Sequence, residues 1–194
     1  MNFYTADSHF SFEDNTIIPR DFRPFNSLEE MNDYIIKTWN EQAGKGDVIY
    51  HLGDFVNYNN FDNTGYEERF KFVKKLNAKV VLILGNNEDK ILNNDFGGDF
   101  EKFKNFLRDC GFFEVYKDGI TKTIGGKKYY LTHRPRDCKK SSEYNLFGHV
   151  HKSVFVKKYG FNVGVDNHYF KLFSEDEVIE LQSRRKIFDE NVYD

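Results

Sequence analysis

The chain has 194 residues, of which 30% are charged, and its formal net charge is −3. This balance excludes a broadly basic nucleic-acid-binding protein, although it leaves a local basic patch open. Two cysteines, Cys110 and Cys138, are too few for a disulfide scaffold. No apolar stretch has the length of a membrane span, and the first residues lack the basic and apolar regions of a signal peptide. We therefore predict one soluble, cytoplasmic domain over residues 1–194, and its oligomeric state stays open.

The first half of the chain alternates predicted strands with predicted helices. Apolar runs predict strands over residues 2–6, 47–52 and 79–84. Ser27 and Glu30 form a capping-box pattern that opens a helix ending near Gly44. A second apolar face at helical spacing predicts a helix over residues 66–76. Polar stretches predict loops over residues 10–26, 57–64 and 136–143.

The second half of the chain is richer in strands. Helical spacing of apolar residues predicts a third helix over residues 100–110. Strands are predicted over residues 112–116, 120–124, 127–131 and 143–147. Residues 154–159 and 161–165 are predicted to form a hairpin around Gly160, and a capping-box pattern at 174–177 opens a short last helix. The alternation of the two element types predicts an α/β fold class.

Polar residues of the kind that bind metals follow several of the predicted strands. His149 and His151 have one residue between them, and in an extended segment this spacing puts both imidazoles on one side of the backbone. Positions just past other strands hold Asp7, His9, Asp54, Asn86 and His133. Because ligands of α/β sheets bind outside the carboxyl ends of the strands, we expect these side chains to converge. Four of the six histidines fall at these positions, which scattered core histidines would not be expected to do.

The composition of this set indicates the metal chemistry. Nitrogen and carboxylate oxygen ligands without sulfur suit Zn, Mn, Fe, Ni or Co. Seven ligands are too many for one tetrahedral ion, and they fit two divalent metal ions about 3.5–4 Å apart that share a carboxylate. Asp7 and Asp54 contribute two negative charges, so two divalent ions would leave the site positive. A positive site favours an anionic substrate, and phosphate esters are the obvious class.

Five motifs occur in order along the chain: Asp7-x-His9, Gly53-Asp54, Gly85-Asn86, His133 and Gly148-His149-x-His151. This series resembles the calcineurin-like metallophosphoesterase family. The segments 9–10, 23–25, 50–55 and 164–166 are also similar to a small single-domain bacterial and phage subgroup of that family. The resemblance implies a four-layer α/β/β/α sandwich with two mixed β-sheets flanked by helices.

The same resemblance implies a role for each ligand. The first ion would be held by Asp7, His9 and His151, the second by Asn86, His133 and His149, and Asp54 would bridge them. A hydroxide between the ions would attack phosphorus and hydrolyse a phosphomonoester or phosphodiester, with Asp54 and His133 in the catalytic set. Mn²⁺ is the ion that we expect to support activity in vitro. The ester stays open: a monoester, a diester, a cyclic nucleotide, a dinucleotide and a nucleic-acid end all fit.

One position departs from the family pattern. The family usually has a histidine where this chain has Asn87. An amide can donate a hydrogen bond to a phosphate, but it cannot deliver a proton near neutral pH. We therefore hypothesise that the metal site is retained and the general acid is missing. His168 is a candidate replacement acid, with an ordinary loop histidine as the plainer alternative, and His51 is predicted to lie in the core or behind the ligands.

Two arginines are candidates for phosphate binding. Arg134 directly follows His133, and Arg23 lies in a loop that could fold over the site. A purely structural role is as good an interpretation for both. Two other functions compete with catalysis: a binding or scaffold module that keeps the fold but lacks the histidine, and a structural site for one metal. Retention of all seven ligands argues against both.

Overall fold

The computed structural model describes residues 1–11, 23–58, 65–139, 144–157 and 159–188. Parts of the three predicted loops, over 10–26, 57–64 and 136–143, lie outside these ranges. Within the ranges, none of the helices combines the length and the apolar character that crossing a bilayer requires.

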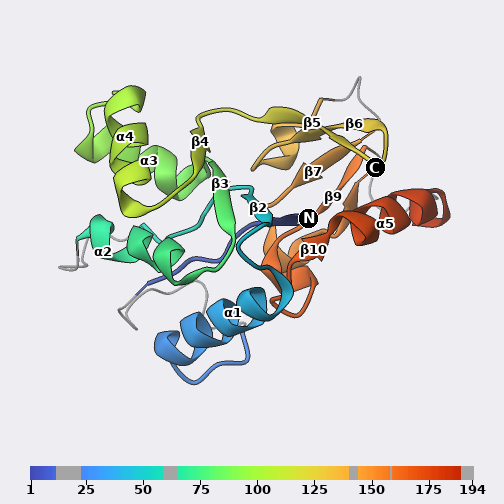
Figure 1. Cartoon of the computed structure of the whole chain (residues 1–194). Coiled ribbons are helices and arrows are strands. Elements are labelled where there is room, and N and C mark those ends of the chain that lie inside the picture. The colour runs from blue at the N-terminus through green and yellow to red at the C-terminus, as the bar shows by residue number, and fades with distance from the viewer. Residues whose placement is uncertain (12–22, 59–64, 140–143, 158, 189–194) are drawn as a thin grey trace.

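Two five-stranded sheets form the centre of the molecule (Figure 1). The first contains, in spatial order, β10 (Phe173–Ser174), β1 (Asn2–Thr5), β2 (Val48–His51), β3 (Lys79–Ile83) and β4 (Glu114–Tyr116). The second contains β5 (Ile120–Ile124), β6 (Lys127–Leu131), β7 (Asn145–Phe147), β9 (Gly160–Asn162) and β8 (Val156–Lys157). Both sheets are mixed: β1 to β4 and β6, β7 and β9 run parallel, and the edge strands β10, β5 and β8 run antiparallel.

Five α-helices accompany the sheets in the described part of the chain. They are α1 (Leu28–Gln42), α2 (Tyr66–Phe70), α3 (Asn86–Asp95), α4 (Phe100–Cys110) and α5 (Glu175–Phe188). The Ser27 side chain accepts a hydrogen bond from the Glu30 backbone N–H and so begins α1, as its capping pattern predicts. Helices α1 to α4 cover the outer face of the first sheet, and α5 lies beside β10 (Figure 1).

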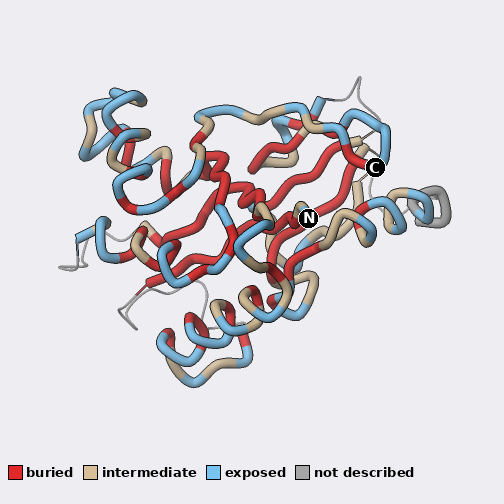
Figure 2. Tube along the Cα trace, in the orientation of Figure 1, coloured by how far each residue is buried: buried red, intermediate tan, exposed pale blue. Residues whose placement is uncertain are grey.

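Two clusters of buried side chains hold these layers together, and alternation along the strands divides them. In β3, Val80 and Leu82 face the helices, whereas Val81 and Ile83 face the second sheet. Figure 2 shows the buried residues following the strands, with exposed residues along the outer sides of the helices. Trp39, fully buried on α1, anchors the helical side of the core. The predicted α/β sandwich of two mixed sheets with flanking helices is therefore confirmed.

Three local predictions need correction. The sequence pattern predicts no helix at α3, which is separated from the end of β3 by two residues. The helix predicted over 66–76 is α2 followed by a 3₁₀ segment, Lys71–Lys75. The predicted hairpin exists, but Gly160 is the first residue of β9 and pairs with Lys157 of β8, so Gly160 belongs to the ladder and is not the centre of the turn.

Candidate metal centre

The seven predicted ligands lie past the carboxyl ends of strands from both sheets. Asp7, His9, Asp54 and Asn86 follow β1, β2 and β3 of the first sheet, and His133, His149 and His151 follow β6 and β7 of the second. A parallel bridge between Ala6 and Gly164 joins the sheets at this edge. The parallel strand order, which points these carboxyl ends to one edge, is what brings residues distant in sequence together.

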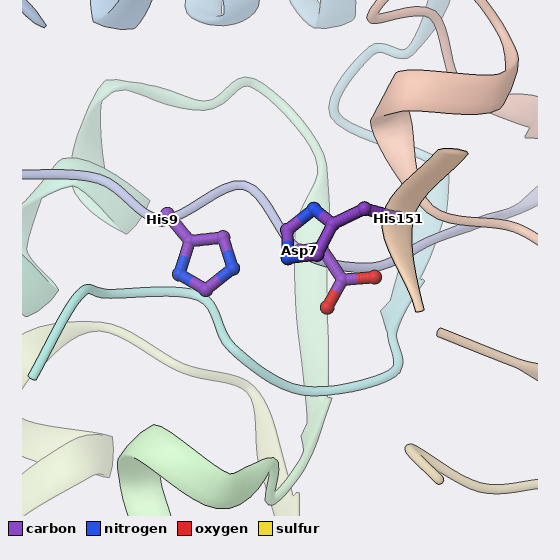
Figure 3. A group of neighbouring side chains, drawn as sticks. All are labelled: Asp7, His9 and His151. Carbon is purple, nitrogen blue, oxygen red and sulfur yellow. The ribbon is translucent and has the colours of Figure 1, made fainter. Parts of the chain in front are cut away.

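Asp7, His9 and His151 form the first group of candidate ligands (Figure 3). One ligand atom from each lies within 4.8 Å of the others. The His9 and His151 rings are stacked with centroids 5.1 Å apart. Both ring nitrogens of His9 are buried, and neither has a hydrogen-bond partner in the described structure. Since buried polar atoms are normally paired, this orphaned imidazole fits a metal ligand.

Asp54, His133 and His149 form the second group, again with ligand atoms within 4.8 Å. The Asn86 side-chain oxygen joins it, 2.9 Å from His133 Nε2 and 2.7 Å from His149 Nδ1. His149 is the exposed member and opens this group toward the surface. Nitrogen and oxygen donors therefore converge here as they do in the first group.

The Asp54 carboxylate of the second group also approaches the first group. Its Oδ2 is 3.8 Å from His9 Nε2 in the first group, and its Oδ1 is 3.5 Å from His133 Nε2 in the second. One oxygen thus faces each group. This geometry is the one expected of a carboxylate shared by two ions.

Hydrogen bonds behind the ligands set the orientation of two imidazoles. His133 Nδ1 lies 2.7 Å from the Leu52 carbonyl oxygen, and His151 Nδ1 lies 2.7 Å from Asp166 Oδ2. Each acceptor requires a proton on Nδ1, which leaves the Nε2 lone pair for the site. Both rings are therefore held in the tautomer that a metal needs.

The backbone at the ligands is unusual. Five of the candidate ligands have positive φ angles between 46° and 74°: Asp7, His9, Asp54, His149 and His151. Non-glycine residues rarely adopt this left-handed region, which costs about 1–3 kcal/mol at each position. Such conformations concentrate where the surrounding structure must aim side chains at a common point.

Glycines next to the ligands allow close approach of the loops. A Cβ at Gly85 would lie 2.3 Å from the Asp54 backbone nitrogen, and one at Gly148 would lie 2.7 Å from Asp7 Oδ2. Either contact is too short for real atoms, so any larger residue would push a ligand away. Close packing against Asp54 and Asp7 therefore explains why glycine occurs at positions 85 and 148 of the motifs.

The effect of burial on the pKa values of the ligands favours a bound cation. Burial raises the pKa of Asp7, and the negative charge of Asp54 raises it further. Burial also raises the pKa of Asp54, lowers that of His9 and lowers the pKa of His133 to about 4. Positive charge between these groups would restore the carboxylates to their ionised form and suit neutral imidazoles. The donors, the orphaned His9 and this charge pattern together fit two divalent ions.

The amino terminus of α3 connects two of the three ligand loops of the first sheet, those after β2 and β3. The backbone N–H of Asn87 donates to Asp54 Oδ1 at 2.9 Å, and the Asn87 side-chain oxygen accepts from the Tyr58 N–H at 3.0 Å. Glu88 is fully buried, and its carboxylate accepts backbone N–H groups from Gly85, Asp54, Phe55 and Val56. Burial and the charge of Asp54 raise the pKa of Glu88 to about 8, while these donors lower it.

Arg23 occupies a buried position behind the site and not the lid that its loop suggests. Its guanidinium forms a two-point ion pair with Asp166 at 2.8 and 2.9 Å and also donates to the backbone carbonyls of Asp7 and Ser8. Its side chain has no exposed surface. This placement argues against the phosphate contact expected of Arg23, because its donors are already engaged.

Burial alone would raise the pKa of Asp166, but the hydrogen bond from His151 and the charge of Arg23 hold that pKa well below its usual range.

Arg134 lies at the rim of the site, where its Nη2 pairs with Asp89 Oδ2 at 2.9 Å. It borders two cavities of about 340 and 640 Å³, one beside His133 and the other beside His149. Its partial exposure leaves it within reach of a ligand that enters either cavity. The two arginines, which the sequence offers equally as phosphate ligands, therefore differ: Arg134 is accessible to a ligand, and Arg23 is buried.

The two remaining histidines lie away from the ligand groups. His51 is fully buried, with its Nε2 3.0 Å from the Ser8 hydroxyl, so the predicted core position is confirmed. The His168 ring stacks on Phe173 at 4.1 Å, and its Nε2 lies 3.2 Å from a Glu177 carboxylate oxygen on α5. This orientation toward α5 argues against His168 as the replacement acid.

Comparison with known proteins agrees with the geometry. A family model described as calcineurin-like phosphoesterase matches residues 4–187, which is nearly the whole chain. The chain belongs to the calcineurin-like phosphoesterase family. The two groups of ligands and their shared carboxylate therefore occur in a family of metal-dependent phosphoesterases, which accounts for their convergence.

Two proteins and one solved structure resemble this chain at low sequence identity. The uncharacterised protein MJ1445 of Methanocaldococcus jannaschii is 27% identical over 196 residues, covering 94% of this chain and 91% of that protein. Phosphodiesterase MJ0936 of the same organism is 27% identical over 116 residues, covering 56% and 59%. The crystal structure of AQ665 from Aquifex aeolicus, a protein of unknown function, is 22% identical, covers 93% of this chain and 98% of that chain, and has a TM-score of 0.64. This structural likeness supports the fold alone.

Proposed function

We propose that this calcineurin-like phosphoesterase hydrolyses phosphate esters with two divalent metal ions, and that phosphodiesters are its first class of substrate. The observation that carries the proposal is the Asp54 carboxylate, which has one oxygen near His9 of the first group and the other near His133 of its own group. A site for one structural ion needs no such shared ligand. The preference for diesters rests on the related protein MJ0936, whose name is phosphodiesterase.

Each residue of the site would have a distinct role in the proposed hydrolysis. Two divalent ions held by these ligands would supply Lewis acidity and would lower the pKa of a bound water. Asp166 and the Leu52 carbonyl hold the rings of His151 and His133, so the ligands do not reorganise during the reaction. The positive end of α3 and the guanidinium of Arg134 would stabilise negative charge that develops on the phosphoryl oxygens. The Asn87 amide would donate a hydrogen bond but no proton.

The decisive experiment measures hydrolysis of an aryl phosphodiester and an aryl phosphomonoester with added Mn²⁺. We expect turnover of the diester by the wild-type protein and its loss in Asp54→Ala, because the shared carboxylate is removed. Asp33→Ala is the matched control, since Asp33 is an exposed aspartate on α1. Equal rates in the wild type and Asp54→Ala would contradict the proposal.

Three expectations stay predictions from the sequence. They are the nucleotide character of the substrate, the cytoplasmic location and the single domain.

Asn87 favours a second candidate function. A chain without the usual histidine could retain metal binding and recognise a phosphate ester without cleaving it. Folded, Mn²⁺-loaded protein that binds a nucleotide but turns over neither aryl ester would indicate this binding module. Hydrolysis that depends on Asp54 would exclude it.

A further inference from the structure

A cavity of about 640 Å³ opens beside His149, the exposed ligand of the second group. Three segments contribute its walls: the stretch after β6, the stretch after β7 and the end of the hairpin strand β8. The described residues that line it are Arg134, Pro135, Arg136, His149, Val150, Lys157 and Tyr159. We call this space the basic cavity. Because His149 forms part of its wall, a substrate bound at the metal centre can extend directly into it.

The charge of the basic cavity differs from that of the whole chain. Arg134, Arg136 and Lys157 supply three positive charges, and no carboxylate is among the described lining residues. The chain as a whole has a formal net charge of −3. The adjacent 340 Å³ cavity shares Arg134 but contains Lys117 and the carboxylates Asp89, Asp118 and Asp137. Of these two cavities at the rim, only the basic cavity is suited to an anion.

The two lining arginines form ion pairs with carboxylates that line the smaller cavity and not the basic cavity. Arg136 Nε is 3.7 Å from Asp137 Oδ1, and both side chains are exposed, so solvent screens the pair and it contributes little. Arg134 pairs with Asp89 through Nη2, on the side of the smaller cavity. Guanidinium groups bind phosphate oxygens in a two-point geometry. The half-buried Tyr159 adds an aromatic wall beside these donors.

We propose that the basic cavity binds a second phosphate group of the substrate, beyond the ester that is cleaved. This inference rests on the proposed phosphoesterase function and narrows its substrate class. The substrate is then a phosphodiester that bears a further phosphate, such as a short oligonucleotide, and not a simple ester with one phosphate. The metal centre holds the scissile group, the space beside Tyr159 takes the intervening sugar and base, and the cations of the cavity bind the second phosphate.

Binding of two thymidine nucleotides to the Mn²⁺-loaded protein tests this assignment without requiring turnover. Thymidine 5′-phosphate offers one phosphate, and thymidine 3′,5′-bisphosphate offers the same group with a second one attached. We expect calorimetry to show about tenfold tighter binding of the bisphosphate, as charge-assisted contacts to one more phosphate would give. The advantage should shrink as NaCl is raised, because these cations are close to solvent.

Variants of the lining residues test whether the tighter binding of the bisphosphate arises in the basic cavity. In Arg136→Gln/Lys157→Gln the ratio of the two affinities should fall to about one, while binding of thymidine 5′-phosphate stays near the wild-type value. Lys117→Gln is the matched control, because Lys117 lines the neighbouring cavity, and it should retain the tenfold ratio. Equal affinities in the wild type, binding of neither nucleotide, or an advantage that persists in the double variant would each overturn the inference.

Hydrolysis of the aryl phosphodiester separates this inference from the proposed function. Wild-type protein that cleaves the aryl diester but binds both nucleotides equally retains the function and loses the second-phosphate site. Protein that prefers the bisphosphate but cleaves no ester retains the site and loses the proposed catalysis.

Discussion

At the scale of single residues, Asp166 connects the metal centre with the protein behind it. Its buried carboxylate accepts from Arg23 on one side and lies 2.7 Å from His151 Nδ1 on the other. Asp166 therefore positions a ligand without being one. Because Arg23 also holds the backbone carbonyls of Ser8 and Asp7, one ion pair supports both chain segments of the first group.

Asp166→Asn tests this support. An asparagine has the same shape, but it has only one acceptor oxygen to divide between Arg23 and His151. We expect Mn²⁺ affinity at the first group to fall about 10–100-fold, as is typical when a hydrogen-bond partner behind a ligand is lost. A metal titration followed by calorimetry measures the change. Asp176→Asn, an exposed aspartate on α5, should bind as the wild type does, and unchanged affinity in Asp166→Asn would refute the role.

Replacement of Asn87 tests whether the site lacks a general acid. Without an acid at this position, esters with alkyl leaving groups should be cleaved poorly, whereas aryl groups leave with little protonation. Asn87→His should therefore raise kcat for an alkyl phosphodiester by about 10²–10⁴-fold and change the aryl rate far less. Steady-state kinetics on the two esters give the answer. An equal effect on both rates would point to altered metal binding instead.

The residues that sequence patterns identify are those that follow strands in the chain. His149 and Asn86 each come directly after a strand and its glycine, so spacing alone indicates them. Asp166 and Glu88 contact their partners only in space: Asp166 reaches a residue 143 positions earlier, and Glu88 reaches one 34 positions earlier. No local periodicity records such contacts. Arg23 illustrates the opposite error, because its loop position suggests exposure that its buried ion pair removes.

At the scale of elements, the amino terminus of α3 determines how the ends of β2 and β3 fit together. The Glu88 carboxylate accepts backbone N–H groups of Gly85 in its own loop and of Asp54 and Phe55 in the loop after β2. It is fully buried. The two loops that carry Asp54 and Asn86 are consequently fixed to each other by one side chain.

Glu88→Gln removes that connection while preserving size. The amide would place N–H donors against backbone donors, leaving some of them buried without a partner. We expect the free energy of unfolding to fall by about 2 kcal/mol, measured by denaturant titration. Glu101→Gln, an exposed residue in the first turn of α4, should change it by less than about 0.5 kcal/mol. A loss no larger than that of the control would show that the loops pack without Glu88.

Sequence patterns identify the long elements and miss α3 for a physical reason. Helix α1 spans 15 residues and has a capping serine and a regular apolar face. Helix α3 spans 10 residues, and its buried apolar residues are Ile91 and Leu92 alone, since Asn87 and Glu88 occupy the rest of its buried face. The polar residues needed by the site thus interrupt the periodicity that would reveal the helix. The sequence prediction wrongly centres the hairpin turn on Gly160, because this glycine allows close approach to Asn145 within the sheet.

At the scale of the whole molecule, His51 makes stability depend on pH. The Ser8 hydroxyl donates to the Phe55 carbonyl, so His51 Nε2–H donates to Ser8, and Nδ1 is buried with no partner in the described structure. Burial lowers the pKa of His51 to about 3 from an ordinary 6.5. Between these values the unfolded chain binds a proton that the folded protein does not. Stability should therefore fall as the pH falls through this window.

Protonation of His51 in the unfolded chain should lower the free energy of unfolding by about 2 kcal/mol between pH 7 and pH 5. The loss is about 1.36 kcal/mol for each pH unit below the ordinary pKa. Denaturant titrations of metal-free protein at the two pH values measure it. His51→Gln keeps a donor for Ser8 but cannot take up a proton, so its loss over the same interval should be smaller by that amount. The same pH dependence in both proteins would assign the effect to other groups.

The division of each ligand group between the two sheets has a consequence for the order of events during synthesis. A nascent chain that has emerged through β4 contains Asp7, His9, Asp54 and Asn86 but none of the ligands from the second sheet. Strand β1 also lacks its outer neighbour until β10, Phe173–Ser174, has left the ribosome. Capture of the ions is therefore expected among the last steps of folding, after almost the entire chain has been translated.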